Sequence, residues 1–176
     1  AHPRTSRLVA TAISTAVAKN GLHQHTFQHV EGDGFEIGKS LVQHPYTAAV
    51  GFTGSLKDGR AIFDYGQQRM NPIPVFAEMG STNPVILLPL ILAEQYESLA
   101  AKLSASMTMG VGQFCTNPGI ILGLAGEDLN KFATALSSQL SASPAFKMLN
   151  EGIHRNYLGR IAEVEKVDGV KVLYKF

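Results

Sequence analysis

Short apolar runs alternate with amphipathic segments along almost the whole chain, and this alternation limits the fold more than any other feature. The apolar runs are typical of buried strands, and the longer segments between them have the apolar period of helices. Consecutive strands joined through helices lie parallel, and the helices then pack on the sheet. The pattern therefore predicts an α/β fold with parallel strands and helices on both faces of the sheet.

The first block of this alternation ends near residue 82. Helices are predicted at Thr5–Asn20, Asp33–His44 and Leu56–Arg69, and strands at Thr26–Val30, Thr47–Thr53 and Pro74–Ala77. In the first two helices the apolar residues form one stripe each, which we expect to face inward. These residues are Leu8, Val9, Ala12, Ile13, Ala16 and Val17 in the first helix, and Phe35, Ile37, Leu41 and Val42 in the second.

A second block begins at Asn83, so we expect one domain at 1–82 and another at 83–176. Its predicted strands are Pro84–Leu88 and Gly119–Leu124, and its predicted helices are Ala93–Met109, Glu127–Leu140 and Asn150–Val164. The tail has two interpretations. Val170–Tyr174 is either a further strand after the turn at Asp168-Gly169, or one arm of a short hairpin around that Asp-Gly pair.

Composition excludes several classes of function. Of the 176 residues 45% are apolar, which is typical of a packed globular protein, and the net charge of +1 without a basic run predicts no nucleic-acid partner. The longest apolar stretch, Pro84–Ala93, is about half the length that spans a bilayer, so no membrane association is expected. Cys115 is the only cysteine. It cannot form an internal disulfide, which fits a reducing compartment such as the cytoplasm.

A glycine-containing turn, Gly51-Phe52-Thr53-Gly54-Ser55-Leu56-Lys57-Asp58-Gly59, joins a strand to a helix. The free N–H groups at the helix start could bind a phosphate. Alternatively, Ser55 and Asp58 form a capping-box-like helix start with no ligand. Both interpretations stay open on these residues alone.

Two further motifs contain residues capable of catalysis. Glu78, in Val75-Phe76-Ala77-Glu78-Met79-Gly80-Ser81, ends an apolar strand, where open α/β sheets bind their ligands. It is a candidate general base, or simply a solvated acid. Cys115, in Gly112-Gln113-Phe114-Cys115-Thr116-Asn117-Pro118, lies in a polar loop. It is a candidate nucleophile, or a small buried apolar residue.

His23, His25 and His29 lie close together in the sequence and suggest a metal site. They have no cysteine or carboxylate partner at a suitable spacing, and zinc needs three or four ligands in fixed geometry. We therefore interpret them as polar loop residues and predict no metal.

Together the three motifs resemble the successive signatures of the aldehyde dehydrogenase superfamily, in its order and at similar spacing. Two of the motif sequences are most similar to the 2,5-dioxovalerate (α-ketoglutarate semialdehyde) dehydrogenase branch: Ala-Glu-Met-Gly-Ser-Thr-Asn-Pro and Gly-Gln-Phe-Cys-Thr-Asn-Pro-Gly. The resemblance implies a partial fold of that family. Residues 1–82 would be the later half of a Rossmann-like NAD(P)-binding domain, and residues 83–176 the first part of the catalytic domain.

The resemblance also implies the chemistry. Cys115 would attack the aldehyde to give a thiohemiacetal, hydride would pass to NADP or NAD, and Glu78 would activate the water that hydrolyses the thioester. The backbone N–H of Cys115 would stabilise the oxyanion. Gly54, Ser55 and Gly59 would meet the cofactor pyrophosphate, and Met79-Gly80 would border the nicotinamide. The substrate would be a small aldehyde acid, plausibly α-ketoglutarate semialdehyde, and the parent enzyme a homo-oligomer, either dimer or tetramer.

The chain departs from the family in two ways. The family's usual second glycine after the glutamate motif is Ser81 here. In addition, several family parts have no counterpart, among them the asparagine of the oxyanion hole and the glutamate that holds the nicotinamide ribose. We therefore expect a fragment that is catalytically inactive alone, and that aggregates or belongs to a larger assembly.

Two other classes of function remain as alternatives. The chain could be a non-catalytic folded module that acts through binding or assembly. It could also be a cysteine hydrolase, although none of its histidines lies in a recognisable triad context.

Overall fold

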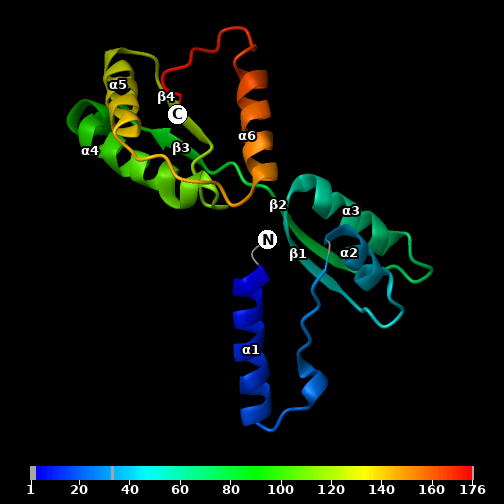
Figure 1. The fold of residues 1–176 in the computed structure, drawn as a ribbon. Helices are drawn as coiled ribbons and strands as arrows, with labels where there is room; N and C mark the ends of the chain where they lie inside the picture. The colour runs from blue at the N-terminus through cyan, green and yellow to red at the C-terminus, as the bar shows by residue number, and fades with distance from the viewer. Residues whose placement is uncertain (1–2, 33, 176) are drawn as a thin grey trace. The chain divides into compact units, whose positions relative to one another are not determined.

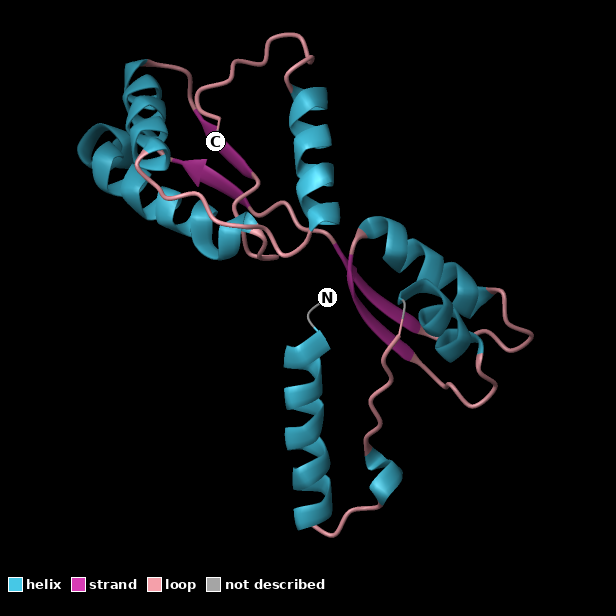
Figure 2. Cartoon of the chain, viewed as in Figure 1, coloured by secondary structure: helices cyan, strands magenta, loops and turns pink. Residues whose placement is uncertain are grey.

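The computed structural model describes residues 3–32 and 34–175. The chain divides into two compact units, Ala1–Gly80 and Ser81–Phe176, close to the predicted boundary at 82/83. Each unit contains one pair of parallel strands with at least one helix packed on it (Figures 1 and 2). None of the helices in the part of the chain that the structure describes has the length and apolar character needed to cross a membrane.

The first unit follows the predicted order of helices and strands. Its elements are α1 (Pro3–Lys19), a 3₁₀ turn η1 (Gln24–Thr26), α2 (Gly34–Gln43), β1 (Val50–Gly54), α3 (Leu56–Gln67) and β2 (Val75–Met79). β1 and β2 pair in parallel, from Val50 opposite Val75 to Gly54 opposite Met79. Because α3 is the connection between these two strands, this region is a complete βαβ unit.

α3 packs closely on this strand pair because Gly59 has no side chain. Gly59 is buried, and a Cβ built there would lie 2.3 Å from the Cγ of Met79 on β2. The half-buried residues of β2, which are Val75, Ala77 and Met79, alternate with the exposed Phe76 and Glu78. Side chains alternate between the faces of a strand, so Glu78 and Phe76 lie on the face opposite the helix.

The second unit repeats this plan with a larger core. Its elements are β3 (Pro84–Leu87), α4 (Pro89–Thr108), a 3₁₀ turn η2 (Met109–Gly112), β4 (Ile120–Gly123), α5 (Glu127–Ser141) and α6 (Glu151–Val164). β3 and β4 are parallel, from Pro84 opposite Ile120 to Leu87 opposite Gly123. α4 begins at Pro89, four residues before the predicted start at Ala93, because proline suits the first turn of a helix.

The core of this unit forms where α4 and α5 pack together over β3 and β4 (Figure 1). Its buried residues come from the strand and from both helices: Leu87, Leu92, Ala100, Leu103 and Phe132. Val85 and Ile121 extend the core onto the two strands. The α/β class with parallel strands is thus confirmed.

Two predicted strands are wrong. Thr26–Val30 contains the end of η1 and then an irregular segment, and Val170–Tyr174 forms neither a strand nor a hairpin arm. Both segments have suitable apolar residues, but within the described residues neither has a neighbouring strand to bond with. The tail is instead held by a hydrogen bond of 3.0 Å from the Ser137 hydroxyl to the Leu173 carbonyl.

The expectation that helices cover both faces of the sheet is also wrong for the described part of the chain. Phe76 on β2 and Ile86 on β3 are about 70% exposed, at 71% and 68%. The apolar stripes of α1 and α2 are largely uncovered too, since Leu8 is 73% exposed and Phe35 is 70% exposed. Only Ala10 of α1 and Val42 of α2 are buried.

Candidate functional site

The carboxyl ends of β1 and β2 bring most of the predicted cofactor residues together. Gly54 lies opposite Met79 in the parallel register, and the N–H of Gly80 donates to the Gly54 carbonyl at 3.3 Å. Gly80 has a φ of 70°, a conformation that glycine adopts without steric cost. Two motifs that are far apart in the sequence therefore meet at one edge of the strand pair, as parallel topology predicts.

The start of α3 shows the predicted capping arrangement. The Ser55 hydroxyl oxygen accepts from the Asp58 N–H at 3.1 Å, and the hydroxyl donates to the Asp58 carboxylate at 2.8 Å. The N–H groups of Leu56 and Lys57 belong to the first turn of the helix, so they have no acceptor within it. Gly54 and Ser55 are exposed beside them, whereas Gly59 is buried against the strands. The cap accounts for one N–H and leaves these two for a ligand.

Glu78 lies on the exposed face of β2. Its partner in the register is Thr53 of β1, which is exposed as well. Both residues lie one position before the last pair of the ladder. A carboxylate there is open to solvent.

Cys115 lies in the second unit, in the loop between η2 and β4, and is exposed. The interpretation of this cysteine as a small buried apolar residue is therefore wrong. The loop follows a run of left-handed residues, Gly110 at φ 58°, Val111 at 61° and Gly112 at 70°. A β-branched residue seldom adopts this conformation, so the turn at Val111 is held by its surroundings against its local preference.

Hydrogen bonds tie the Cys115 loop to the chain segment before β3. The carbonyl oxygen of Cys115 accepts from the Ser81 hydroxyl at 2.5 Å and from the Asn83 side-chain amide at 2.7 Å. The Asn83 amide also donates to the Asn117 carbonyl at 3.0 Å. These bonds were not predicted, and the only signal for them in the sequence is the run Ser81-Thr82-Asn83 itself.

The three histidines do not form a group. The rings of His23 and His25 lie 5.1 Å apart at a tilted angle of 52°, and the His23 side chain caps η1. His29 shares a hydrogen bond of 2.8 Å with the Ser6 hydroxyl on α1. Among the described residues, no three side chains of His, Cys, Asp or Glu are arranged to hold a metal ion.

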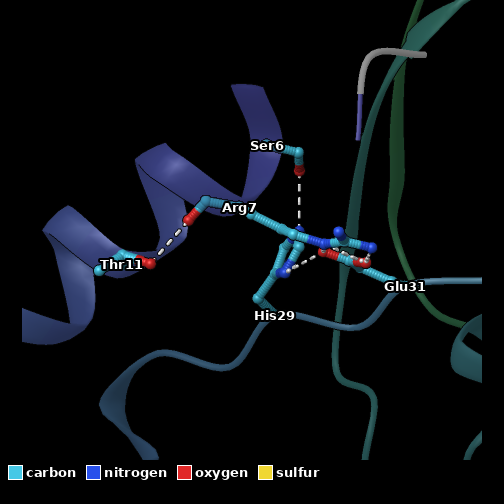
Figure 3. A network of polar contacts seen from close by, with 5 residues as sticks. All are labelled: Ser6, Arg7, Thr11, His29 and Glu31. Atoms are coloured by element: carbon cyan, nitrogen blue, oxygen red, sulfur yellow. Dashed lines mark hydrogen bonds and ion pairs between the residues drawn. The ribbon is translucent and has the colours of Figure 1, made fainter. Parts of the chain in front are cut away.

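His29 belongs to a polar network that fixes the segment after η1 to α1 (Figure 3). Arg7 donates through its Nε to both carboxylate oxygens of Glu31 at 2.7 Å. Ser6, His29 and Glu31 have the residue types of a hydrolase triad. However, the 3.6 Å between His29 and Glu31 is too long for a hydrogen bond, and Arg7 already binds both oxygens. The network is a structural tether.

The tether should weaken in acid. Hydrogen bonding to Arg7 lowers the pKa of the Glu31 carboxyl below its ordinary value of 4.5. A lowered folded-state pKa means that the stabilising contact is complete above 4.5 and is lost as the pH falls through the lowered value. We expect the NMR signals of the segment around Glu31 to move toward those of an unfolded peptide in that range. The variant Glu31→Gln should show the detached signals already at neutral pH, and an unchanged wild-type spectrum at low pH would contradict the expectation.

Comparison with known proteins finds relatives of this chain in both sequence and fold. Residues 2–146 match the model of the aldehyde dehydrogenase family. Alpha-ketoglutaric semialdehyde dehydrogenase 2 of Azospirillum brasilense is 46% identical over 95% of the chain, and alpha-ketoglutaric semialdehyde dehydrogenase of Acinetobacter baylyi is 41% identical over 98%. The chain spans 32% of the length of each relative.

Solved structures show the same fold. An NAD-dependent benzaldehyde dehydrogenase from Corynebacterium glutamicum superposes with a TM-score of 0.73 at 20% identity. The match covers 93% of this chain and 36% of that enzyme. The predicted partial fold of this family is confirmed.

Proposed function

The chain belongs to the aldehyde dehydrogenase family, and on this premise we propose that the protein carrying it oxidises an aldehyde to a carboxylic acid with NADP or NAD. The exposed Cys115, in a loop held by hydrogen bonds to its main chain, carries the proposal. A thiol in this position is open to a small electrophile.

In the proposed reaction the Cys115 sulfur, as a thiolate, forms a bond to the aldehyde carbon and gives a thiohemiacetal. The N–H of Cys115 stabilises the negative oxygen that develops. NAD(P), when bound, would supply the hydride acceptor for this carbon, and Cys115 would then hold the oxidised product as a thioester. Glu78 then takes a proton from water, the water oxygen displaces the sulfur, and the acid leaves.

We propose that Glu78 and Cys115 cooperate because the resemblance gives both motifs a role in one mechanism. The two residues are separated in the sequence by 36 positions, from Met79 to Phe114. Between them lies Ser81, whose hydroxyl donates to the Cys115 carbonyl.

The end of the first strand pair fits a dinucleotide. We assign the pyrophosphate to the exposed Gly54 and Ser55 and to the unbonded first-turn N–H groups of α3, which favour an anion. Gly59 contributes by letting α3 approach β2 closely. Met79 and Gly80 border the nicotinamide in this proposal, where the left-handed Gly80 leaves the backbone bare.

The names of the two bacterial relatives suggest the substrate. We propose α-ketoglutarate semialdehyde, a small aldehyde that carries an acid, as the substrate of the whole protein. Because the chain spans about a third of those relatives, at 32%, we propose that residues 1–176 alone are inactive and that the active form is a homo-oligomer. Because a single cysteine cannot form an internal disulfide, we propose the cytoplasm, a reducing compartment, as the location.

The test is to measure reduced cofactor by absorbance with the full-length protein, using α-ketoglutarate semialdehyde and a neutral aldehyde of similar length in parallel. The acidic aldehyde should be oxidised with the higher kcat/KM, and NAD and NADP assayed separately identify the cofactor. If neither aldehyde is oxidised, the chain functions instead as a non-catalytic binding or assembly module.

A further inference from the structure

We propose that Ser81 and Asn83 are positioning residues that hold the nucleophile loop through the main-chain carbonyl of Cys115. The inference rests on the proposed role of Cys115 as the nucleophile. It adds two residues to that site, neither of which touches the substrate. Ser81 stands where the wider superfamily usually has a glycine, and a glycine has no hydroxyl to donate.

The two donors saturate one acceptor. A carbonyl oxygen has two lone pairs, and the Cys115 oxygen receives the Ser81 hydroxyl at 2.5 Å and the Asn83 amide at 2.7 Å. The second proton of the Asn83 amide goes to the Asn117 carbonyl at 3.0 Å. One asparagine side chain thus binds the loop on both sides of Thr116.

Packing contributes little to holding this loop. Phe114, Cys115 and Thr116 are all exposed, so few apolar contacts fix them. Polar bonds fix the neighbouring residues instead: the Asn117 side-chain amide donates to the Met107 carbonyl at 2.8 Å, and the Gln113 side-chain oxygen Oε1 accepts from the Leu149 N–H at 2.9 Å. At Cys115 itself, a turn bond of 3.1 Å from the Asn117 N–H to the Phe114 carbonyl spans the residue, and the bonds from Ser81 and Asn83 hold its own carbonyl.

Fixing this carbonyl also limits the positions that the sulfur can take. The peptide plane after Cys115 sets the direction of its Cα–Cβ bond, and the sulfur then moves only among the staggered rotamers about that bond. Reaction rates depend steeply on such alignment, because displacement of a reacting group by about 1 Å can cost 10²-fold. Loss of a donor should therefore reduce the fraction of molecules with the sulfur correctly aimed, without changing what binds the substrate.

The test compares matched variants of the full-length protein. Ser81→Ala should lower kcat about fivefold, the factor expected for one neutral hydrogen bond, and leave KM and Tm near the wild-type values. Ser81→Thr keeps the hydroxyl and should restore most of kcat. Ser98→Ala removes an exposed hydroxyl from α4 and should change nothing. Equal kcat for Ser81→Ala and wild type, or no rescue by threonine, would overturn the proposal.

A second readout uses the full-length protein and needs no turnover. Amide hydrogen exchange at residues 113–117 should become about fivefold faster in Ser81→Ala, and not in Ser98→Ala. Unchanged exchange would show that the hydroxyl does not hold the loop. The variant Cys115→Ser distinguishes failure of the proposed function from failure of the positioning role. If Cys115→Ser is fully active, the proposed function is wrong. If Cys115→Ser is inactive while Ser81→Ala has wild-type activity, only the positioning role is wrong.

Discussion

Replacing Cys115 by serine should reduce kcat/KM for aldehyde oxidation by at least about 10⁴-fold in the full-length protein, since loss of a covalent nucleophile removes the whole route through its intermediate. A serine hydroxyl fits the same space but is a far weaker nucleophile without an activating base. The measurement is the steady-state rate of cofactor reduction. Residual activity within tenfold of the wild type would contradict the assignment.

The chain provides its own control for this variant. Cys115 is the only cysteine in the sequence, so a thiol reagent should label the 176-residue chain once and the serine variant not at all. Labelling should also block turnover in the full-length protein if no other thiol is modified. Circular dichroism of the variant should match that of the wild type, because the exposed side chain contributes little to packing.

Replacing Glu78 by glutamine should lower steady-state turnover by about 10²- to 10⁴-fold, the range for loss of a general base. The first equivalent of reduced cofactor should still form rapidly, because in the proposed mechanism Glu78 acts after hydride transfer. The enzyme would then accumulate as the thioester. Rapid-mixing measurement of cofactor absorbance should show this burst, followed by a slow phase.

Glu94→Gln is the matched control, since Glu94 is an exposed carboxylate on α4. It should turn over at the wild-type rate. Normal steady-state turnover in Glu78→Gln would remove Glu78 from the mechanism. Loss of the burst together with the slow phase would move its role to an earlier step.

The sequence predicted the helices and the paired strands well because their residues satisfy local rules. The apolar period identified α1, α3 and α5 to within a few residues, and the parallel order of β1 and β2 followed from the helix between them. The meeting of the Gly54 and Gly80 turns at one edge was predictable for the same reason. Local sequence patterns and the rules of parallel topology were therefore sufficient to predict these helices and strand pairs.

The errors have a common physical cause, which is that an apolar residue does not identify its partner. Thr26–Val30 and Val170–Tyr174 have strand-forming residues, but a strand exists only when a neighbour completes its ladder. Likewise, the stripe of α1 was predicted to be inward, yet Leu8 is exposed because no described segment covers it. The period of the apolar residues predicts that a segment is a helix, but it does not predict which surface packs against the apolar side of that helix.

The residues of the candidate site were predicted from the sequence, but the hydrogen bonds that hold the Cys115 loop were not. Glu78 and Cys115 were identified from their motifs, and their joint action stays a prediction. The bonds from Ser81 and Asn83 to Cys115 span more than thirty residues and depend on Asn83 adopting a φ of 45°. Asparagine tolerates this left-handed conformation better than most residues. No spacing rule relates such a side chain to a distant carbonyl, so only coordinates show the bond.

The parallel pairing of the strands also sets an order of events during translation. β1 can pair only after β2 has been synthesised, because Val50 pairs with Val75. β3 can pair only after Ile120, at the start of β4, has been added. Closing the longer second loop costs only about 0.3 kcal/mol more in chain entropy, so neither closure is much harder than the other. Since each ladder closes within its own unit, the nascent chain can complete the first βαβ motif while the ribosome is still adding the residues that contain the cysteine.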